Sequence, residues 1–117
     1  MTDLYRLVPE VPGIDDYLRL RVDAGLSPKS REGASIGLPN SWFGVTLKFE
    51  GKAIGMGRII GDGGTAFQIV DIALEPEHQG KGLGKRIMAA LMEKLHNDAP
   101  AGAYVSLIAD GDAKHLY

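Results

Sequence analysis

The chain has 117 residues, of which 44% are hydrophobic and 24% are charged, and these values are typical of one ordinary globular domain rather than of a two-domain enzyme. The formal net charge of −2 gives no overall attraction to nucleic acid or to an anionic membrane, so we expect neither as a partner. The absence of cysteine excludes disulfides, thiolate metal sites and a cysteine nucleophile.

The N-terminal sequence has no charged segment followed by an apolar one, and nowhere do about eighteen apolar residues run together. We therefore expect a soluble, cytoplasmic protein. The three histidines, His78, His96 and His115, are spaced too widely for a zinc pattern, so no metal site is expected.

The first forty residues predict one short strand and two helices. Residues 4–8 alternate weakly in polarity and end at a proline, which indicates a strand. An imperfect apolar stripe at Ile14, Tyr17, Leu18, Leu20 and Val22 predicts a helix that ends at Gly25. Ser27 and Pro28 are typical of the N-cap and first position of a second helix through about residue 34, with residues 37–41 as a connector.

Residues 42–74 predict an antiparallel meander of three strands. Aromatic and β-branched residues are enriched over 42–49, 53–60 and 66–74, and Glu50-Gly51 and Asp62-Gly63-Gly64 have the composition of tight turns. The strands should therefore pair as consecutive hairpins.

The second half of the chain predicts a strand–helix–strand unit. Leucine and isoleucine recur every four residues from Leu83 to Leu95, as in a helix packed by one face, and a fifth strand is expected at 103–109. Asp112 starts a further helical turn. Because a helix connects them, strands 66–74 and 103–109 should be parallel, with a right-handed crossover. The predicted class is α/β (α+β), with a mixed, mostly antiparallel sheet flanked by helices.

The loop Gln79-Gly80-Lys81-Gly82-Leu83-Gly84 lies between the third meander strand and that helix. Its glycines and the unpaired N–H groups of the first helical turn predict a phosphate site. A Walker-type loop is excluded because Gln79 replaces its first glycine and Arg86 its hydroxyl residue. The glycine spacing also differs from that of the dinucleotide fingerprint.

Gln-x-x-Gly-x-Gly between a strand and a helix resembles the coenzyme A diphosphate-binding loop of the GNAT (GCN5-related N-acetyltransferase) superfamily. Residues 70–77 are similar to the family's central strand and its exit, and Ala113-x-x-Leu116-Tyr117 to its Ala-x-x-Leu-Tyr segment. The resemblance implies one GNAT domain over residues 1–117, in which the two parallel strands splay at a bulge and form the acetyl-CoA cleft. The family continues through two more strands after that tyrosine, so the domain is expected to be C-terminally incomplete.

The resemblance also implies the cofactor-binding residues. The cofactor is acetyl-CoA (coenzyme A), and its expected contacts lie on the strand end, in the loop and before the terminal tyrosine: Ile72, Ala73, Leu74, Gln79, Gly80, Lys81, Gly82, Leu83, Gly84, Lys85 and Asp110. The N–H group of Leu74 is the expected oxyanion donor. Asp110 stands where many relatives have asparagine.

Two side chains are candidates for catalysis. By the resemblance, Tyr117 is the general acid that protonates the leaving thiolate; the alternative is a half-buried packing residue. Asp71 is a carboxylate within an apolar strand, where strand alternation places it on one face with Ile69 and Ala73. It either accepts the amine proton through water or anchors a cationic substrate, or it is a structural carboxylate bonded to the backbone or to Arg58.

The implied activity is acetyl transfer from acetyl-CoA to a primary amine of a small molecule or an amino terminus, by direct attack in a ternary complex. The alternative is a non-catalytic acyl-CoA or phosphate-binding regulatory module. Without the two final strands, the edge of the fifth strand around residues 104–108 would be adhesive, which predicts that the chain either self-associates through that edge, as in a homodimer, or is poorly stable alone. The acceptor amine, the general base and the state of the C-terminus stay open.

Overall fold

The computed structural model describes residues 4–107, which form one five-stranded sheet and three α-helices. The sheet has the order β1-β2-β3-β4-β5, with antiparallel pairs throughout β1–β4 and a parallel β4–β5 pair, which confirms the predicted mixed sheet. The strands are β1 (Tyr5–Val8), β2 (Phe43–Phe49), β3 (Lys52–Gly61), β4 (Ala66–Leu74) and β5 (Tyr104–Leu107). The helices are α1 (Ile14–Asp23), α2 (Arg31–Gly37) and α3 (Leu83–Asp98), with short 3-10 helices η1 (Leu38–Asn40) and η2 (Pro76–His78).

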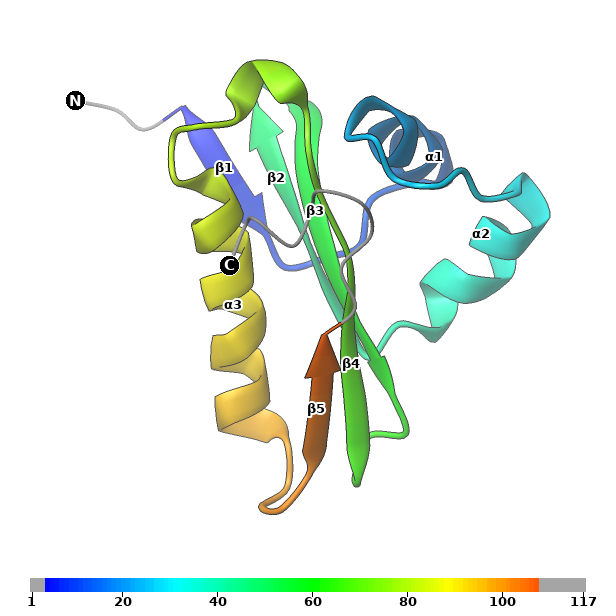
Figure 1. Ribbon diagram of the computed structural model, residues 1–117, viewed down its shortest axis with the longest axis vertical. Helices are drawn as coiled ribbons and strands as arrows, with labels where there is room; N and C mark the ends of the chain where they lie inside the picture. The colour runs from blue at the N-terminus through cyan, green and yellow to red at the C-terminus, as the bar shows by residue number, and fades with distance from the viewer. Residues whose placement is uncertain (1–3, 108–117) are drawn as a thin grey trace.

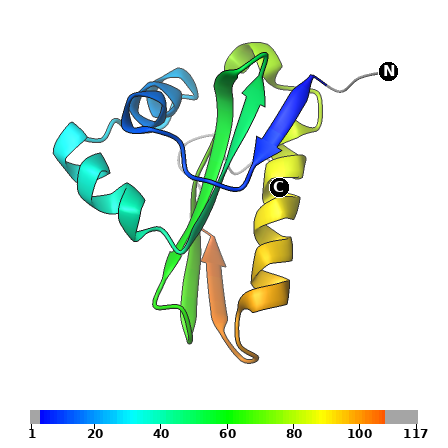
Figure 2. The same ribbon diagram turned by 180° about the vertical axis from the view of Figure 1, so that it is seen from behind.

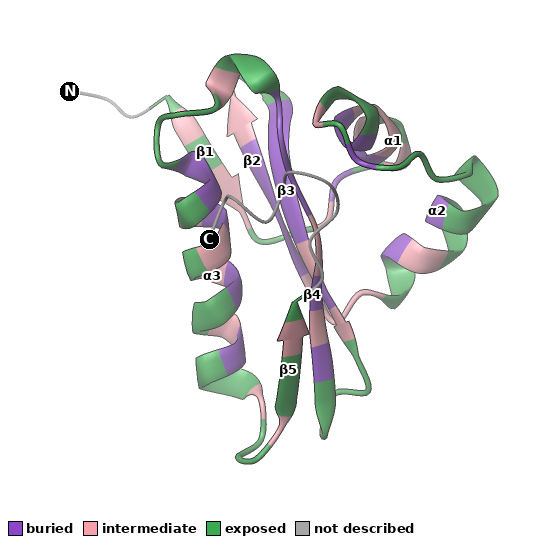
Figure 3. Ribbon diagram, viewed as in Figure 1, coloured by how far each residue is buried: buried purple, intermediate pink, exposed green. Residues whose placement is uncertain are grey.

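The helices cover both faces of the sheet. Figures 1 and 2 show α3 on one face and α1 and α2 on the other. The central strands carry most of the buried positions between these layers (Figure 3). On the α3 side, Leu83, Ile87, Leu91 and Leu95 are all buried against the sheet, so the predicted four-residue stripe is confirmed. A second apolar cluster fills the space between the sheet and α1 and α2.

Helix α1 ends where the sequence predicted but buries a different face. Gly25 has a φ of +82°, and the N–H groups of Leu26 and Gly25 donate to the carbonyls of Arg21 and Val22, which closes the helix as a Schellman motif. Val22, expected in the buried stripe, is 61% exposed, and Arg21 is buried in its place. The prediction was wrong at this position because a charged residue was not considered as part of the buried face.

Helix α2 begins three residues later than predicted. Its N-cap is Ser30, whose Oγ accepts the N–H of Gly33 at 2.9 Å. The prediction of Ser27 as the N-cap was wrong, because the carbonyl and hydroxyl oxygens of Ser27 accept hydrogen bonds from the Arg21 guanidinium instead. The expected connector after α2 contains η1.

The turn between β3 and β4 is built around one carboxylate. Asp62 Oδ1 accepts the N–H groups of Gly64, Thr65 and Ala66, and Oδ2 accepts the Thr65 hydroxyl. The Thr65 hydroxyl first, and then the backbone donors, hold the pKa of Asp62 well below its ordinary value. This network accounts for the predicted turn.

A bulge interrupts the pairing of β3 with β4. Met56 pairs with Ala73 and Arg58 pairs with Val70, so Asp71 and Ile72 together lie opposite the single residue Gly57. Asp71 has a φ of +59°, in the left-handed region. Before the bulge, Ile69 packs toward α3; after it, Ile72 does so, while Ala73 joins the cluster beside α1. The expectation that Asp71 shares a face with Ile69 was therefore wrong, and its shared face with Ala73 is confirmed.

The second half of β4 pairs on one side only within the described residues. Strand β5 pairs with Ala66–Ile69 and no further, whereas the pairing of β4 with β3 continues to Leu74. The residues from Val70 to Leu74 therefore present one edge to neither β3 nor the described part of β5.

Gly57 lies where α3 approaches the bulge. A Cβ at this position would lie 2.8 Å from Ile87 Cγ2 and 2.9 Å from Leu91 Cδ1. We expect Gly57→Ala to lower the free energy of unfolding in urea by about 1–3 kcal/mol, because the core has no room for the methyl group. Gly37→Ala is the control, since Gly37 has a φ of −73° and open space around it, and it should not destabilise. Equal stability of Gly57→Ala and the native protein would contradict this account.

Candidate functional site

The loop between β4 and α3 has the backbone that its glycines predicted. Gly80 and Gly82 have φ values of +82° and +79°, and a Cβ at either position would meet no atom within 4 Å. These glycines are therefore required by conformation and not by crowding. Gly82 is also the N-cap of α3, and no side chain among residues 4–107 caps that end of the helix.

The first turn of α3 presents unpaired backbone donors. The helix's first bond runs from the N–H of Arg86 to the carbonyl of Gly82, at 3.2 Å. The N–H groups of Leu83, Gly84 and Lys85 precede it and have no intrahelical acceptor. The exposed side chains of Lys81 and Lys85 add positive charge at the same place. Backbone donors, helix dipole and cations together favour a phosphate-bearing ligand.

Side-chain contacts fix the segment that connects the end of β4 to the loop. Gln79 Nε2 donates to the carbonyl of Leu74 at 3.0 Å, and the Tyr5 hydroxyl lies 2.7 Å from Nδ1 of His78. Glu75 is 3% exposed, and its carboxylate binds the side chains of Arg19 and Lys52. The loop thus starts from a fixed point at the end of β4.

The N–H and C=O groups of Leu74 face the edge of β4 that the described part of β5 does not cover. The N–H of Glu75 donates to the carbonyl of Ile54 on the β3 side at 2.8 Å, whereas the carbonyl of Leu74 accepts from Gln79. The N–H and C=O of one residue in an extended strand point to the same side. The N–H of Leu74 therefore points away from β3, as the expected oxyanion donor requires.

Asp71 is the centre of a buried polar cluster between β4 and α1. Its side chain is 6% exposed. Oδ1 accepts from Arg21, while Oδ2 accepts from Nε of Arg58 at 2.8 Å and from the hydroxyl of Tyr17 at 3.0 Å. The bond to Arg58 is the one that the structural interpretation of Asp71 required. Three donors already occupy this carboxylate, which disfavours a role as proton acceptor, and that role stays an untested prediction.

The hydroxyl of Tyr17 acts as a donor in this cluster. Burial raises its pKa, and the charge and hydrogen bond of Asp71 raise it further, against smaller opposing effects of Arg58 and Arg21. Tyr17 therefore stays protonated near neutral pH, and it cannot serve as a phenolate base there.

Sequence reasoning missed Tyr17 and Arg21 as parts of the site. They lie four residues apart, on the α1 face that also carries the fully buried Leu20. The sequence did contain a sign of them, because Arg21 lies four residues after Tyr17 and so on the same helix face as buried residues. A charged side chain on a buried face needs an oppositely charged partner elsewhere in the fold.

Several predicted residues lie outside the described part of the chain. They are Tyr117, Asp110, the end of the fifth strand after Leu107 and the helical turn at Asp112. On β5 itself, Tyr104, Val105 and Leu107 are exposed, and self-association through that edge stays a prediction. Over residues 4–107, no helix combines the length and apolar character needed to cross a membrane. The same residues contain no group of three or more metal-ligating side chains.

The fold and the loop together define a class of protein. A mixed sheet with a bulged central strand, a glycine-rich loop and a helix that starts without a side-chain cap among the described residues is the arrangement that the resemblance to the GNAT superfamily implied. The family model described as the acetyltransferase (GNAT) family matches residues 13–117. The chain belongs to this family.

One solved structure of high identity agrees with this assignment, and two more distant ones share the fold. A protein of unknown function from methicillin-resistant Staphylococcus aureus, described as a probable acetyltransferase, is 50% identical, with a TM-score of 0.90 over 97% of this chain and 85% of that one. A GNAT family acetyltransferase from Streptococcus pneumoniae is 24% identical, with a TM-score of 0.73 over 95% and 80% of the two chains. Glucosamine-6-phosphate N-acetyltransferase from Arabidopsis thaliana shares the fold at 18% identity, with a TM-score of 0.70 over 98% and 88%. A comparison with curated proteins found no significant match.

The buried position of Asp71 predicts a large effect on stability. Asparagine has nearly the same shape as aspartate and tolerates a positive φ, so Asp71→Asn removes mainly the negative charge. We expect the free energy of unfolding in urea to fall by about 3 kcal/mol, because Arg21 and Arg58 lose their counter-ion.

Asp15→Asn is the matched control. Asp15 pairs with Arg31, but its side chain is 86% exposed, and the expected change is roughly 0.5 kcal/mol or less. If both variants change stability equally, the cluster at Asp71 has no special structural role.

Proposed function

We propose that this protein is an acetyl-CoA-dependent N-acetyltransferase that acts on a primary amine of a small molecule or an amino terminus, by direct attack in a ternary complex. The observation that carries the proposal is the uncapped start of α3 behind Gly80 and Gly82, in a chain of the GNAT family. The 50% identical relative described as a probable acetyltransferase supports it.

The described residues fit this cofactor. The free N–H groups of Leu83, Gly84 and Lys85 are donors for its diphosphate, and Lys81 and Lys85 offset the negative charge. The edge of β4 from Val70 to Leu74 offers backbone groups to the pantetheine arm, as an added strand would use them. When bound, acetyl-CoA supplies an acetyl group that is activated as a thioester.

Two groups of the chain would assist the reaction. The N–H of Leu74 would stabilise the negative charge that develops on the carbonyl oxygen during attack. The hydroxyl of Tyr117, outside the described residues, would donate a proton to the sulfur atom that leaves. The amine must arrive unprotonated, and its nitrogen must be held close to the acetyl carbon. As the N–C bond forms and the C–S bond breaks, the nitrogen would lose a proton to solvent, and solvent would return one to the Tyr117 phenolate.

Turnover separates this enzyme from a binding module. Purified protein is mixed with acetyl-CoA and a panel of amines, and free thiol is measured over time. Amine-dependent thiol release supports the transferase. Tight coenzyme A binding without thiol release for any amine would instead identify a non-catalytic acyl-CoA-binding module.

The loop backbone gives the next prediction. Gly82→Val should abolish coenzyme A binding in calorimetry, because a β-branched residue cannot hold a φ of +79° and the N–H groups would be displaced. Lys81→Ala should weaken binding only modestly and in a salt-dependent manner.

Gly63→Val is the matched control. Gly63 has a φ of +84° but lies in the turn before β4, at the opposite end of that strand from the loop. It should keep the native affinity even if its stability falls. Unchanged affinity in Gly82→Val would remove the loop from the cofactor site.

Tyr117→Phe tests the proton donor. If the Tyr117 hydroxyl protonates the leaving sulfur, this variant should bind coenzyme A normally and lose turnover by on the order of 10²-fold or more. The measurement is kcat beside the calorimetric Kd of coenzyme A. A native kcat would reduce Tyr117 to a packing residue.

A further inference from the structure

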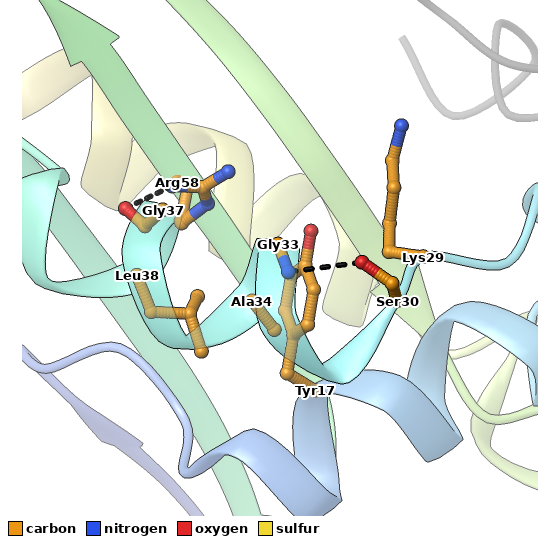
Figure 4. A pocket seen from close by; sticks show the side chains of 8 residues that line it. All are labelled: Tyr17, Lys29, Ser30, Gly33, Ala34, Gly37, Leu38 and Arg58. Atoms are coloured by element: carbon orange, nitrogen blue, oxygen red, sulfur yellow. Dashed lines mark hydrogen bonds between the residues drawn. The ribbon is translucent and has the colours of Figure 1, made fainter.

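A small cavity lies on the side of the sheet that α1 and α2 cover. Tyr17 from α1, Arg58 from β3, and Lys29 and Ser30 from the segment before α2 line it, together with small residues of α2 (Figure 4). Its volume is about 180 Å³. This is below the roughly 300–1,000 Å³ of sites for drug-sized ligands, so the cavity suits a small molecule or a single functional group.

The lining of this cavity carries positive charge. Lys29 and Arg58 are cationic, and none of the residues from the described part of the chain that line the cavity is a carboxylate. The carboxylate that Arg58 binds, Asp71, also accepts from Arg21, so one negative charge faces two guanidinium groups there. The positive charge at the cavity is therefore not neutralised by the residues that line it.

The cavity also offers more donors than acceptors. Nε of Arg58 binds Asp71, and Nη1 donates to the carbonyl of Gly37 and to Ser41 Oγ. Nη2 has no acceptor among residues 4–107. Every buried side-chain nitrogen in that part of the chain has a hydrogen-bond partner, so Nη2 is not fully buried. It belongs to a side chain that lines the cavity.

Ser30 adds a neutral donor. Its Oγ accepts the N–H of Gly33, which leaves the hydroxyl hydrogen available to a ligand. The Tyr17 hydroxyl, by contrast, already donates its hydrogen to Asp71. The residues that line this small volume thus carry an ammonium, a guanidinium N–H pair and a hydroxyl, which is the donor set that carboxylates and phosphates accept from.

We propose that this cavity binds an anionic group of the acceptor, so that the substrate of this enzyme is a small amine that carries a carboxylate or a phosphate. The inference rests on the proposed function and names its substrate class. A polyamine or a lysine side chain would bring a second positive charge close to Arg58 and Lys29, and repulsion between like charges would disfavour its binding. A neutral amine would leave the cavity's charges without a partner.

Four two-carbon amines with different ends test the proposal. They are β-alanine with a carboxylate, O-phosphoethanolamine with a phosphate, ethanolamine with a neutral hydroxyl and ethylenediamine with a second amine. Binding of each to the protein with coenzyme A is followed by NMR, through the amide signals of Gly33 and Gly37, which line the cavity. This readout does not depend on turnover.

We expect one or both anionic amines to bind at least about tenfold more tightly than ethanolamine, the size of effect that one charge-assisted hydrogen bond produces. The carboxylate and phosphate probes show which anion is preferred. Lys29→Met should weaken the anionic amines by about tenfold and leave ethanolamine unchanged, since it removes a charge from an exposed side chain.

Lys48→Met is the matched control. It makes the same substitution on β2, four residues from Gly44, which pairs with Arg58. It should not change any of the four affinities. Arg58 itself is left intact because it holds Asp71.

The outcomes are distinct. Equal or tighter binding of ethanolamine or ethylenediamine overturns the proposal, as does anion binding that leaves Gly33 and Gly37 unshifted or ignores Lys29→Met. Absence of anion binding at tens of millimolar overturns it as well. Thiol release assays with the same four amines test the transferase separately: acetyl-CoA binding with no release for any amine would defeat the proposed function, while the NMR result would still decide whether the cavity holds an anion.

Discussion

The ion cluster at Asp71 is the constraint on which the rest of this structure depends. A non-glycine residue at positive φ costs about 1–2 kcal/mol, and a buried carboxylate costs more unless it is bonded. Arg21, Arg58 and Tyr17 supply those bonds from a helix and a neighbouring strand. The cluster therefore holds a strained backbone position in place and ties α1 to the sheet at the same time.

The bulge that this cluster stabilises has two consequences for the sheet. It reverses the alternation of β4, so that Ile69 and Ile72 both reach the α3 core although they are three residues apart. A bulge of this kind increases the local twist of a strand, and this one lies just after Ile69, the last residue of β4 that pairs with the described part of β5. The residue at the bulge, Asp71, also anchors α1 through Arg21 and Tyr17.

Much of the fold was readable from the sequence because its signals are local. The four-residue stripe of α3, the turn residues after Phe49 and Gly61, and the glycines of the loop each specify their own geometry. The family resemblance implied a bulge in this strand, but local signals did not place it at Asp71, since Asp71 at positive φ needs Arg21 and Arg58, which are distant in sequence. The predicted start of α2 was wrong for a related reason. Ser27 accepts hydrogen bonds from Arg21, and Ser30 is the N-cap instead.

The two halves of the site differ in the same way. The proposed cofactor half is made of backbone N–H groups at the start of α3 and along β4, so glycine spacing is enough to suggest it in a sequence. The proposed acceptor half is made of side chains from α1, from β3 and from the segment before α2, and no spacing connects Tyr17, Lys29 and Arg58. Recognition of a ligand by the backbone constrains only a few glycines. Recognition by side chains would change with a single substitution, such as one at Lys29. A family that keeps one donor and changes its acceptors would be expected to divide its binding site between backbone and side chains in this manner.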